Sequence, residues 1–198
     1  MRIAALLLVL GAAYALAQLW LPRSAHAAFV ATLYARAARR YRVLAFISPS
    51  RERRRASRLS LAGCAVAGGH LADAARLLAA FDEQALAPAE RAVWLNNRAW
   101  LALEVDPVDA RTALELAESA SALRPDVPAI QHTRARALLA ADRIDDAITL
   151  LDAMRSGGEL TASVEADRCR SLALAWDRKG EPEYAADYRA RTPSVVVP

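Results

Sequence analysis

Apolar and small residues recur at helical spacing through the last three-quarters of the chain, in segments separated by turn-like stretches. Alanine and leucine dominate and β-branched residues are few, which favours helices over strands. Four pairs of alanines flank such stretches: Ala62/Ala74, Ala99/Ala113, Ala135/Ala147 and Ala173/Ala185. Small side chains there let antiparallel helices approach closely, and their recurrence every 34–39 residues predicts a helix-turn-helix solenoid.

A different pattern opens the chain. Residues 3–21 carry no charge, and a helix of that length spans about 28 Å, close to the roughly 30 Å hydrocarbon core of a bilayer. Trp20 lies at the end of this run, and Pro22-Arg23 is expected to close it. We expect residues 1–24 to be a transmembrane anchor. The alternative is a cleaved signal sequence, because Ala25-His26-Ala27 fits the A-x-A pattern, and the remainder would then be a secreted or periplasmic soluble subunit.

Charge is distributed unevenly along the chain. Residues 1–72 contain eleven arginines and one acid, Glu52, whereas the remainder is acidic overall. Several arginines follow the apolar run closely: Arg23, Arg36, Arg39, Arg40 and Arg42. Only Arg2 and the α-amine precede that run, so the positive-inside rule predicts a cytoplasmic body. A body on the periplasmic side stays open as the alternative.

Residues 25–50 are expected to form a basic amphipathic helix or linker. One face of the helix would be apolar: Val30, Leu33, Tyr34, Ala37, Tyr41 and Leu44. This face could lie in the lipid headgroup layer, with the arginine stems reaching outward, or it could pack on the first repeat. Ser48-Pro49-Ser50 should end the helix, because the residue before a proline avoids the α conformation.

The region 51–192 resembles the tetratricopeptide repeat family, most clearly in residues 95–154. Ala99, Ala113 and Ala120 stand at the small positions of the family pattern, and Pro125 closes that repeat. The resemblance implies an all-α, right-handed superhelical array. About four repeats are expected, followed by an extended tail at 193–198; the repeats fall at about 53–86, 90–125, 128–154 and 161–192.

In this family the first helices of the repeats line a concave groove that binds protein segments. The positions that match the groove are Asn96, Trp100, His132, Arg136 and Arg170. Their hydrogen-bond donors, single aromatic ring and two cations would suit an acidic or carboxylate-ended peptide. The resemblance therefore implies an adaptor or assembly subunit for a protein partner, whose identity the sequence leaves open.

Motifs for catalysis or cofactor binding are missing from the sequence. Cys64 and Cys169 fall on first helices of different repeats, too far apart for a disulfide. The three histidines (His26, His70 and His132) are dispersed, and no phosphate-binding loop or nucleophile elbow occurs. We expect no enzyme activity, no cofactor and no metal.

A run of arginines lies at 51–58, which raises nucleic-acid binding as a further alternative: Arg51, Arg53, Arg54, Arg55 and Arg58. No aromatic residue is interleaved for base stacking, and no recognition fold is visible in the sequence. We therefore expect a solvated or lipid-facing start to the first repeat, and no nucleic-acid partner.

Overall fold

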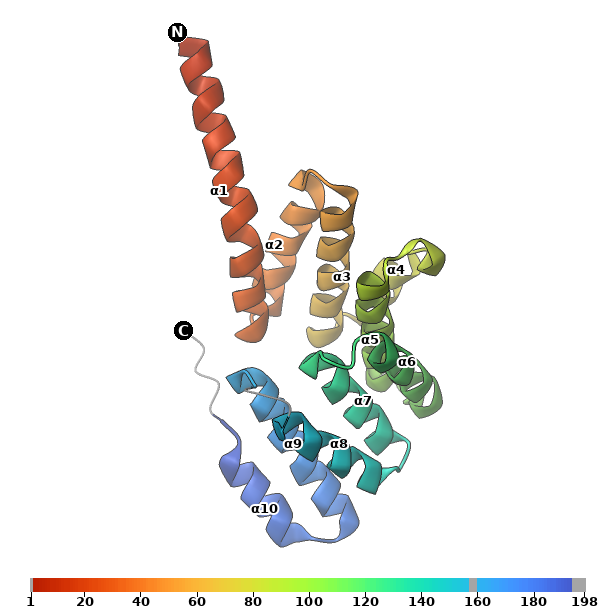
Figure 1. Cartoon of the computed structure of the whole chain (residues 1–198). Helices are drawn as coiled ribbons and strands as arrows, with labels where there is room; N and C mark the ends of the chain where they lie inside the picture. Colours follow the sequence, from red (N-terminus) through yellow and green to blue (C-terminus); the bar gives the residue numbers. More distant parts are fainter. Residues whose placement is uncertain (1, 157–159, 194–198) are drawn as a thin grey trace.

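The computed structural model describes residues 2–156 and 160–193, and within these ranges the chain is helical with no strand (Figure 1). Of the tail predicted at 193–198, all but Pro193 lies outside the described residues. The elements are α1 (Arg2–Val30), α2 (Tyr34–Ile47), α3 (Arg51–Ala67), α4 (Leu71–Ala79), the short 3-10 helix η1 (Glu83–Ala85), α5 (Pro88–Glu104), α6 (Ala110–Leu123), α7 (Pro128–Ala140), α8 (Ile144–Ser156), α9 (Ala162–Lys179) and α10 (Pro182–Arg191).

Helices α3 to α10 stack as four consecutive hairpins. Within each hairpin the two helices contact one another, as in α5 with α6 and α9 with α10. The first helices form their own series of contacts, from α3 to α5, α7 and α9, and each second helix also contacts the first helix of the next hairpin. Because each hairpin packs mainly on its neighbours, this is the arrangement of an all-α repeat array (Figure 1).

The alanines that suggested the repeats lie in the interior of these hairpins. All eight are buried: Ala62, Ala74, Ala99, Ala113, Ala135, Ala147, Ala173 and Ala185. Ala99 and Ala113 belong to one buried cluster, and Ala135 and Ala147 belong to another. Two helices can approach closely at such positions because a methyl group is the largest side chain between them.

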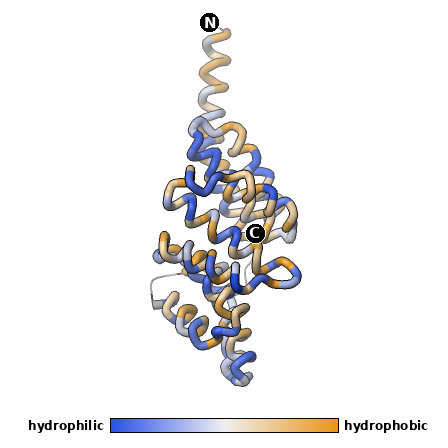
Figure 2. The backbone as a smooth tube through the Cα atoms, turned by 90° about the vertical axis from the view of Figure 1, so that its right-hand side faces the viewer, coloured by the Kyte–Doolittle hydropathy of each residue, from blue (hydrophilic) through white to orange (hydrophobic). Residues whose placement is uncertain are grey.

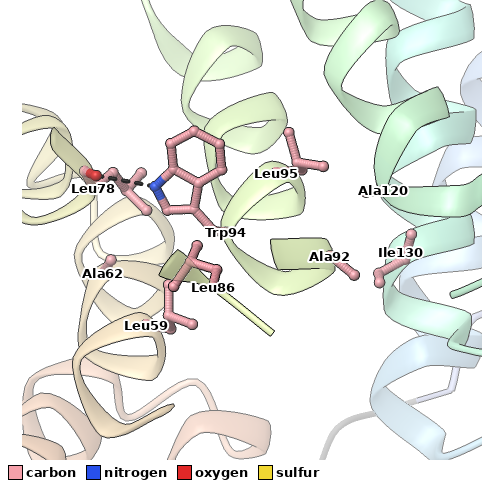
Figure 3. Close-up of a cluster of buried hydrophobic side chains, with 9 residues drawn as sticks. All are labelled: Leu59, Ala62, Leu78, Leu86, Ala92, Trp94, Leu95, Ala120 and Ile130. Carbon is pink, nitrogen blue, oxygen red and sulfur yellow. Dashed lines mark hydrogen bonds between the residues drawn. The ribbon is translucent and has the colours of Figure 1, made fainter. Parts of the chain in front are cut away.

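A larger cluster joins the first hairpin to the second (Figure 3). Trp94 on α5 is buried, and its indole Nε1 donates a hydrogen bond to the carbonyl of Leu78 at 3.0 Å. Asn97, one turn further along α5, donates from Nδ2 to the carbonyl of Leu59 at 2.9 Å. These two hydrogen bonds hold α5 against α3 and α4, and each gives a buried side-chain donor its acceptor.

Local chemistry sets several helix ends. Proline occupies the first turn of α5, α7 and α10, where its missing N–H costs nothing, at Pro88, Pro128 and Pro182. Asp109 caps α6 by accepting a hydrogen bond from the Thr112 N–H at 3.0 Å. Gly180 ends α9 with a φ of 82°, a left-handed conformation that glycine adopts without steric cost.

The first helix corrects one expectation. Helix α1 passes through Pro22 and continues to Val30, so the expected end at Pro22-Arg23 is wrong. Its last turns pack on α2, where Ala25 and Ala28 are buried and Arg40 Nη1 donates to the Ser24 carbonyl at 2.6 Å. Tertiary packing thus holds the helix together past a residue that cannot donate its backbone hydrogen bond. Residues 25–50 are therefore shared between α1 and α2.

The apolar face of α2 packs inside the protein. Ala37 and Leu44 are buried, and Ala37 joins Ala28 of α1 and Cys64 of α3 in one cluster. Of the two alternatives for this face, packing on the first repeat is the one that the structure adopts. Helices α1 and α2 therefore add a further hairpin at the N-terminal end of the array.

One helix of the described chain is long and apolar enough to cross a membrane. The segment Ala5–Val30 within α1 comprises 26 residues, and a stretch of 18 residues within it has a mean hydropathy of 1.8. Figure 2 shows the hydrophobic N-terminal end of α1 projecting from the body, with strongly hydrophilic segments near the point where it joins. This surface is the most extended exposed apolar feature of the described residues.

Candidate functional site

The first helices of hairpins two and three meet at an acid that the sequence analysis missed. Glu104, at the end of α5, accepts a hydrogen bond on Oε1 from Trp100 Nε1 at 3.1 Å. The same oxygen accepts from Nη2 of Arg136 on α7 at 2.8 Å. Two residues predicted for the groove, Trp100 and Arg136, are thus joined through one carboxylate. The spacing of Trp100 and Glu104, one turn apart on a helix, was the available signal.

The next link runs from α7 to α9. His132 lies one turn before Arg136, and its Nε2 is 3.0 Å from Oγ of Ser171. Burial lowers the pKa of His132 to about 4, although the nearby Asp167 opposes the shift. At neutral pH this imidazole is therefore uncharged, and it takes part as a hydrogen-bonding group.

The last predicted cation also has an acidic neighbour. Arg170 forms an ion pair with Asp167 one turn earlier on α9, and both side chains are exposed. Together these residues make a line across three consecutive hairpins, from α5 through α7 to α9. We call it the first-helix strip: Trp100, Glu104, His132, Arg136, Asp167 and Arg170.

Asn96 and Trp100 are half-buried, so only part of each side chain is accessible to a partner. The ring of Trp100 packs against a buried cluster that contains Ala65 and Ala74. Asn96 lies one turn earlier on α5 and is half-buried, and its Oδ1 has no hydrogen-bond partner in the described part of the chain. Trp100 thus serves the core and the strip at once.

The charges of the strip balance. Arg136 is paired with Glu104, and Arg170 is paired with Asp167. The two cations expected to suit an acidic peptide each have a carboxylate beside them in the structure. A partner would have to replace one member of an ion pair in order to contact the other. This favours partner segments that carry both positive and negative side chains.

An open cavity of about 870 Å³ lies between α2 and the first repeat hairpin and is lined by residues outside the strip. Its basic lining comes from Arg36, Arg39 and Arg42 of α2, together with His70 and Arg76. Arg76 is paired with Asp73. Arg36, Arg39 and Arg42 of α2 thus line this open cavity, whereas Arg40 binds the Ser24 carbonyl of α1.

Two of the arginines at the start of α3 have structural contacts. Arg55 forms an ion pair with Glu90 of α5 at 3.0 Å, and Arg54 Nη1 donates to the Ser48 carbonyl at 2.7 Å. These contacts support the view that part of the run stabilises the fold, as opposed to binding nucleic acid. Arg51 and Arg53 remain exposed.

The cysteines lie in the interior. Both Cys64 and Cys169 are buried and free. Burial raises the pKa of Cys64 to about 12, and burial also raises the pKa of Cys169, so both thiols stay protonated and are poor nucleophiles. In the described ranges, no group of three or more His, Cys, Asp or Glu residues is placed to hold a metal ion.

Comparison with known proteins places one part of the chain in a family. Residues 108–157 match the tetratricopeptide repeat family. Searches of curated proteins and of solved structures each gave no match. Tetratricopeptide repeats generally mediate protein–protein interaction. The match and the hairpin packing together identify a protein that carries a tetratricopeptide repeat within an all-α array of similar hairpins, behind a helix long and apolar enough to span a membrane.

Proposed function

We propose that the protein is a membrane-tethered adaptor or assembly subunit that binds a protein partner along the first-helix strip. The observation that carries this proposal is a pair of links between first helices: Arg136 on α7 bonds to Glu104 on α5, and His132 on α7 bonds to Ser171 on α9. A segment lying across α5, α7 and α9 would meet one half-buried aromatic ring and two exchangeable ion pairs. Repeat arrays commonly offer such extended surfaces to their partners.

The chemistry of the strip favours a partner segment with both a carboxylate and a cation. The carboxylate would compete with Glu104 or Asp167 for an arginine, while the cation would take the vacated acid. Charge-assisted contacts between arginine and a carboxylate are stronger than hydrogen bonds between neutral groups. His132 adds a neutral donor or acceptor between the two ion pairs.

Loss of partner capture tests this proposal. Arg136→Ala and Arg170→Ala should each weaken binding by about 1–3 kcal/mol, the loss expected when a charge-assisted contact disappears. The matched control is Arg111→Ala, which removes an exposed arginine that pairs with Glu115 on the second helix α6. Quantitative pull-down of cross-linked partners from native membranes, with circular dichroism of each variant, gives the measurement. Equal capture by all three folded variants would exclude the strip as the binding surface.

Tethering is proposed through α1. Retention of the segment is supported by its packing, because cleavage after Ala27 would remove the buried Ala25 and the Ser24 carbonyl that Arg40 binds. The arginines that follow the apolar run support a body on the cytoplasmic side. A mature chain beginning at Ala28 would instead establish the secreted or periplasmic subunit, and sequencing the N-terminus of the purified protein distinguishes the two.

A further inference from the structure

The turn between α2 and α3 lies beside the middle of the apolar run of α1. Tyr14 Oη donates a hydrogen bond to the Ile47 carbonyl at 3.0 Å, and Gln18 Nε2 donates to the same oxygen at 3.3 Å. Helix α2 therefore returns along α1 as far as Tyr14 (Figure 1). Only the part of α1 before Tyr14 projects beyond this turn.

We call residues 43–54 the hairpin tip, and its side chains combine exposed apolar groups with exposed cations. Phe46 is 87% exposed, more than any other large apolar side chain of the described chain, and Val43 is 47% exposed. Arg51 and Arg53 are exposed a few residues later. An exposed phenylalanine near arginines is typical of surfaces that meet lipid.

The tip is held in place by its own hydrogen bonds. Ser50 Oγ accepts a hydrogen bond from the backbone N–H of Arg53 at 3.1 Å. Arg54 Nη1 donates to the Ser48 carbonyl at 2.7 Å, which joins the start of α3 to the end of α2. These hydrogen bonds join the end of α2 to the start of α3 and so hold the backbone of the tip.

Length then determines where the tip lies when α1 enters a bilayer. From Arg2 to Tyr14 the helix rises by about 18 Å, little more than half of a hydrocarbon core of roughly 30 Å. The rest of the apolar run, residues 15–21, lies below the tip, alongside α2. If the whole apolar run lies within a bilayer, Tyr14 lies within it too. The hairpin tip, which is beside Tyr14, must then also enter the bilayer.

We infer that the hairpin tip is a second membrane-contact site, which inserts Phe46 among the acyl chains and binds the phosphates of anionic phospholipids through Arg51 and Arg53. This inference rests on the proposed tethering through α1. The exposed apolar side chains of the tip lie near the apolar run of α1, and an arginine can bury its stem while its charged end points toward the headgroups. The two positive charges complement an anionic leaflet.

An environment-sensitive dye on the full-length chain tests the depth of the tip. Pro49→Cys places the dye at an exposed position in the tip, and Val108→Cys places it in an exposed loop between α5 and α6 as the control. Labelling is selective because both native cysteines are buried and protonated. In vesicles of phosphatidylcholine with phosphatidylglycerol, the dye at 49 should shift to shorter wavelength and be quenched by quencher-bearing lipids, whereas the dye at 108 should report water.

Two substitutions in the labelled chain separate the apolar from the ionic contribution. Phe46→Ser should reduce insertion in all vesicles. The double variant Arg51→Gln, Arg53→Gln should lower the ratio of chains with an inserted tip to chains with a solvent-exposed tip. The decrease should be about five-fold for each arginine removed and should occur only in anionic vesicles. The control for charge is Arg111→Gln, far from the tip on α6, which should leave the signal unchanged.

The outcomes distinguish this inference from the proposed tethering. If the full-length chain does not float with vesicles at all, both the tethering and the tip contact are overturned. If the chain floats but the dye at 49 reports water, the tip contact is overturned and the anchor stands. Equal insertion in neutral and anionic vesicles, unchanged by the arginine substitutions, would overturn the binding of anionic headgroups.

Discussion

Single residues hold this array together through size more than through chemistry. Small side chains occupy the closest contacts between helices, whereas the larger fully buried side chains, such as Leu138, Leu151 and Leu172, fill the spaces between them. Arg168 is one exception, since it is buried and pairs with Glu165 while donating to the Leu151 carbonyl. A buried cation is tolerated there because its donors are satisfied.

The first prediction concerns the size limit at a helix contact. Replacing Ala135 by Leu should lower the free energy of unfolding by about 1–3 kcal/mol, because the site is fully buried between α7 and its neighbours. Ala129→Leu, at an exposed position of the same helix, is the matched control and should change stability little. Urea unfolding of both variants provides the measurement, and equal effects would argue against the close contact at Ala135.

The second prediction concerns the charge state of His132. Its pKa is about 4 in the folded protein, below the ordinary value of 6.5, so the unfolded chain binds more protons between these values. The free energy of unfolding should therefore be unaffected by this group above pH 6.5 and fall as the pH drops toward 4. The slope from one such group is at most about 1.4 kcal/mol per pH unit.

The variant His132→Gln removes this titration while keeping a group that can bond to Ser171. Urea unfolding of both proteins from pH 7.5 to pH 4 should show that the wild type loses more stability than the variant over the acidic half of the range. Parallel curves would mean that His132 is not buried as a neutral group.

At the scale of elements, helix ends and helix packing follow different rules. The ends agree with local chemistry, as at the Asp109 cap and the Gly180 stop. The course of α1 through Pro22 does not, because contacts with α2 outweigh the local preference to stop. The return of α2 along α1 is likewise a packing effect, fixed by hydrogen bonds to the Ile47 carbonyl.

The third prediction tests a helix end. Gly180→Ala should destabilise the last hairpin by about 1–2 kcal/mol, since a side chain in the left-handed conformation carries a steric cost. No atom lies close enough to clash with the added methyl group, so the backbone conformation alone should account for the loss. Gly180→Asn should cost less, because asparagine tolerates this conformation better. Thermal unfolding ranks the three proteins, and equal stability of all three would contradict the reasoning.

At the scale of the whole molecule, the array is a short stack with an apolar helix at one end. The strip on α5, α7 and α9 lies in the part that includes the matched repeat, whereas the hairpin tip lies beside the projecting end of α1 (Figure 1). The surface proposed for the protein partner and the surface proposed for lipid are thus carried by different hairpins. Binding at one should leave the other accessible.

The fourth prediction concerns attachment to membranes. The full-length chain should stay in the membrane fraction through washing with high salt and with alkaline carbonate, because α1 exposes an apolar surface along most of its length. A chain lacking residues 2–13 keeps the contacts from Tyr14 onward and should remain helical, but high salt should release it. Recovery of the full-length protein in the salt-washed soluble fraction would contradict the proposed anchor.

The sequence by itself determined the class of the fold. Composition and the recurrence of alanines predicted an all-α repeat array, and the match at 108–157 agrees with it. An apolar N-terminal helix was also readable, since nineteen uncharged residues leave few alternatives. The repeat boundaries and the groove residues stay predictions, although the helices lie in the expected ranges.

Only the tertiary structure decided which groups meet. Glu104 joins Trp100 to Arg136, and Asp167 pairs with Arg170. The strip is therefore balanced in charge, although the charged residues predicted for it were both arginines. The sequence likewise did not predict that the α2–α3 turn lies beside Tyr14. Periodicity reports which face of a helix is buried, whereas the neighbour across that face depends on how the hairpins stack, and a pattern within one helix carries no information about that contact.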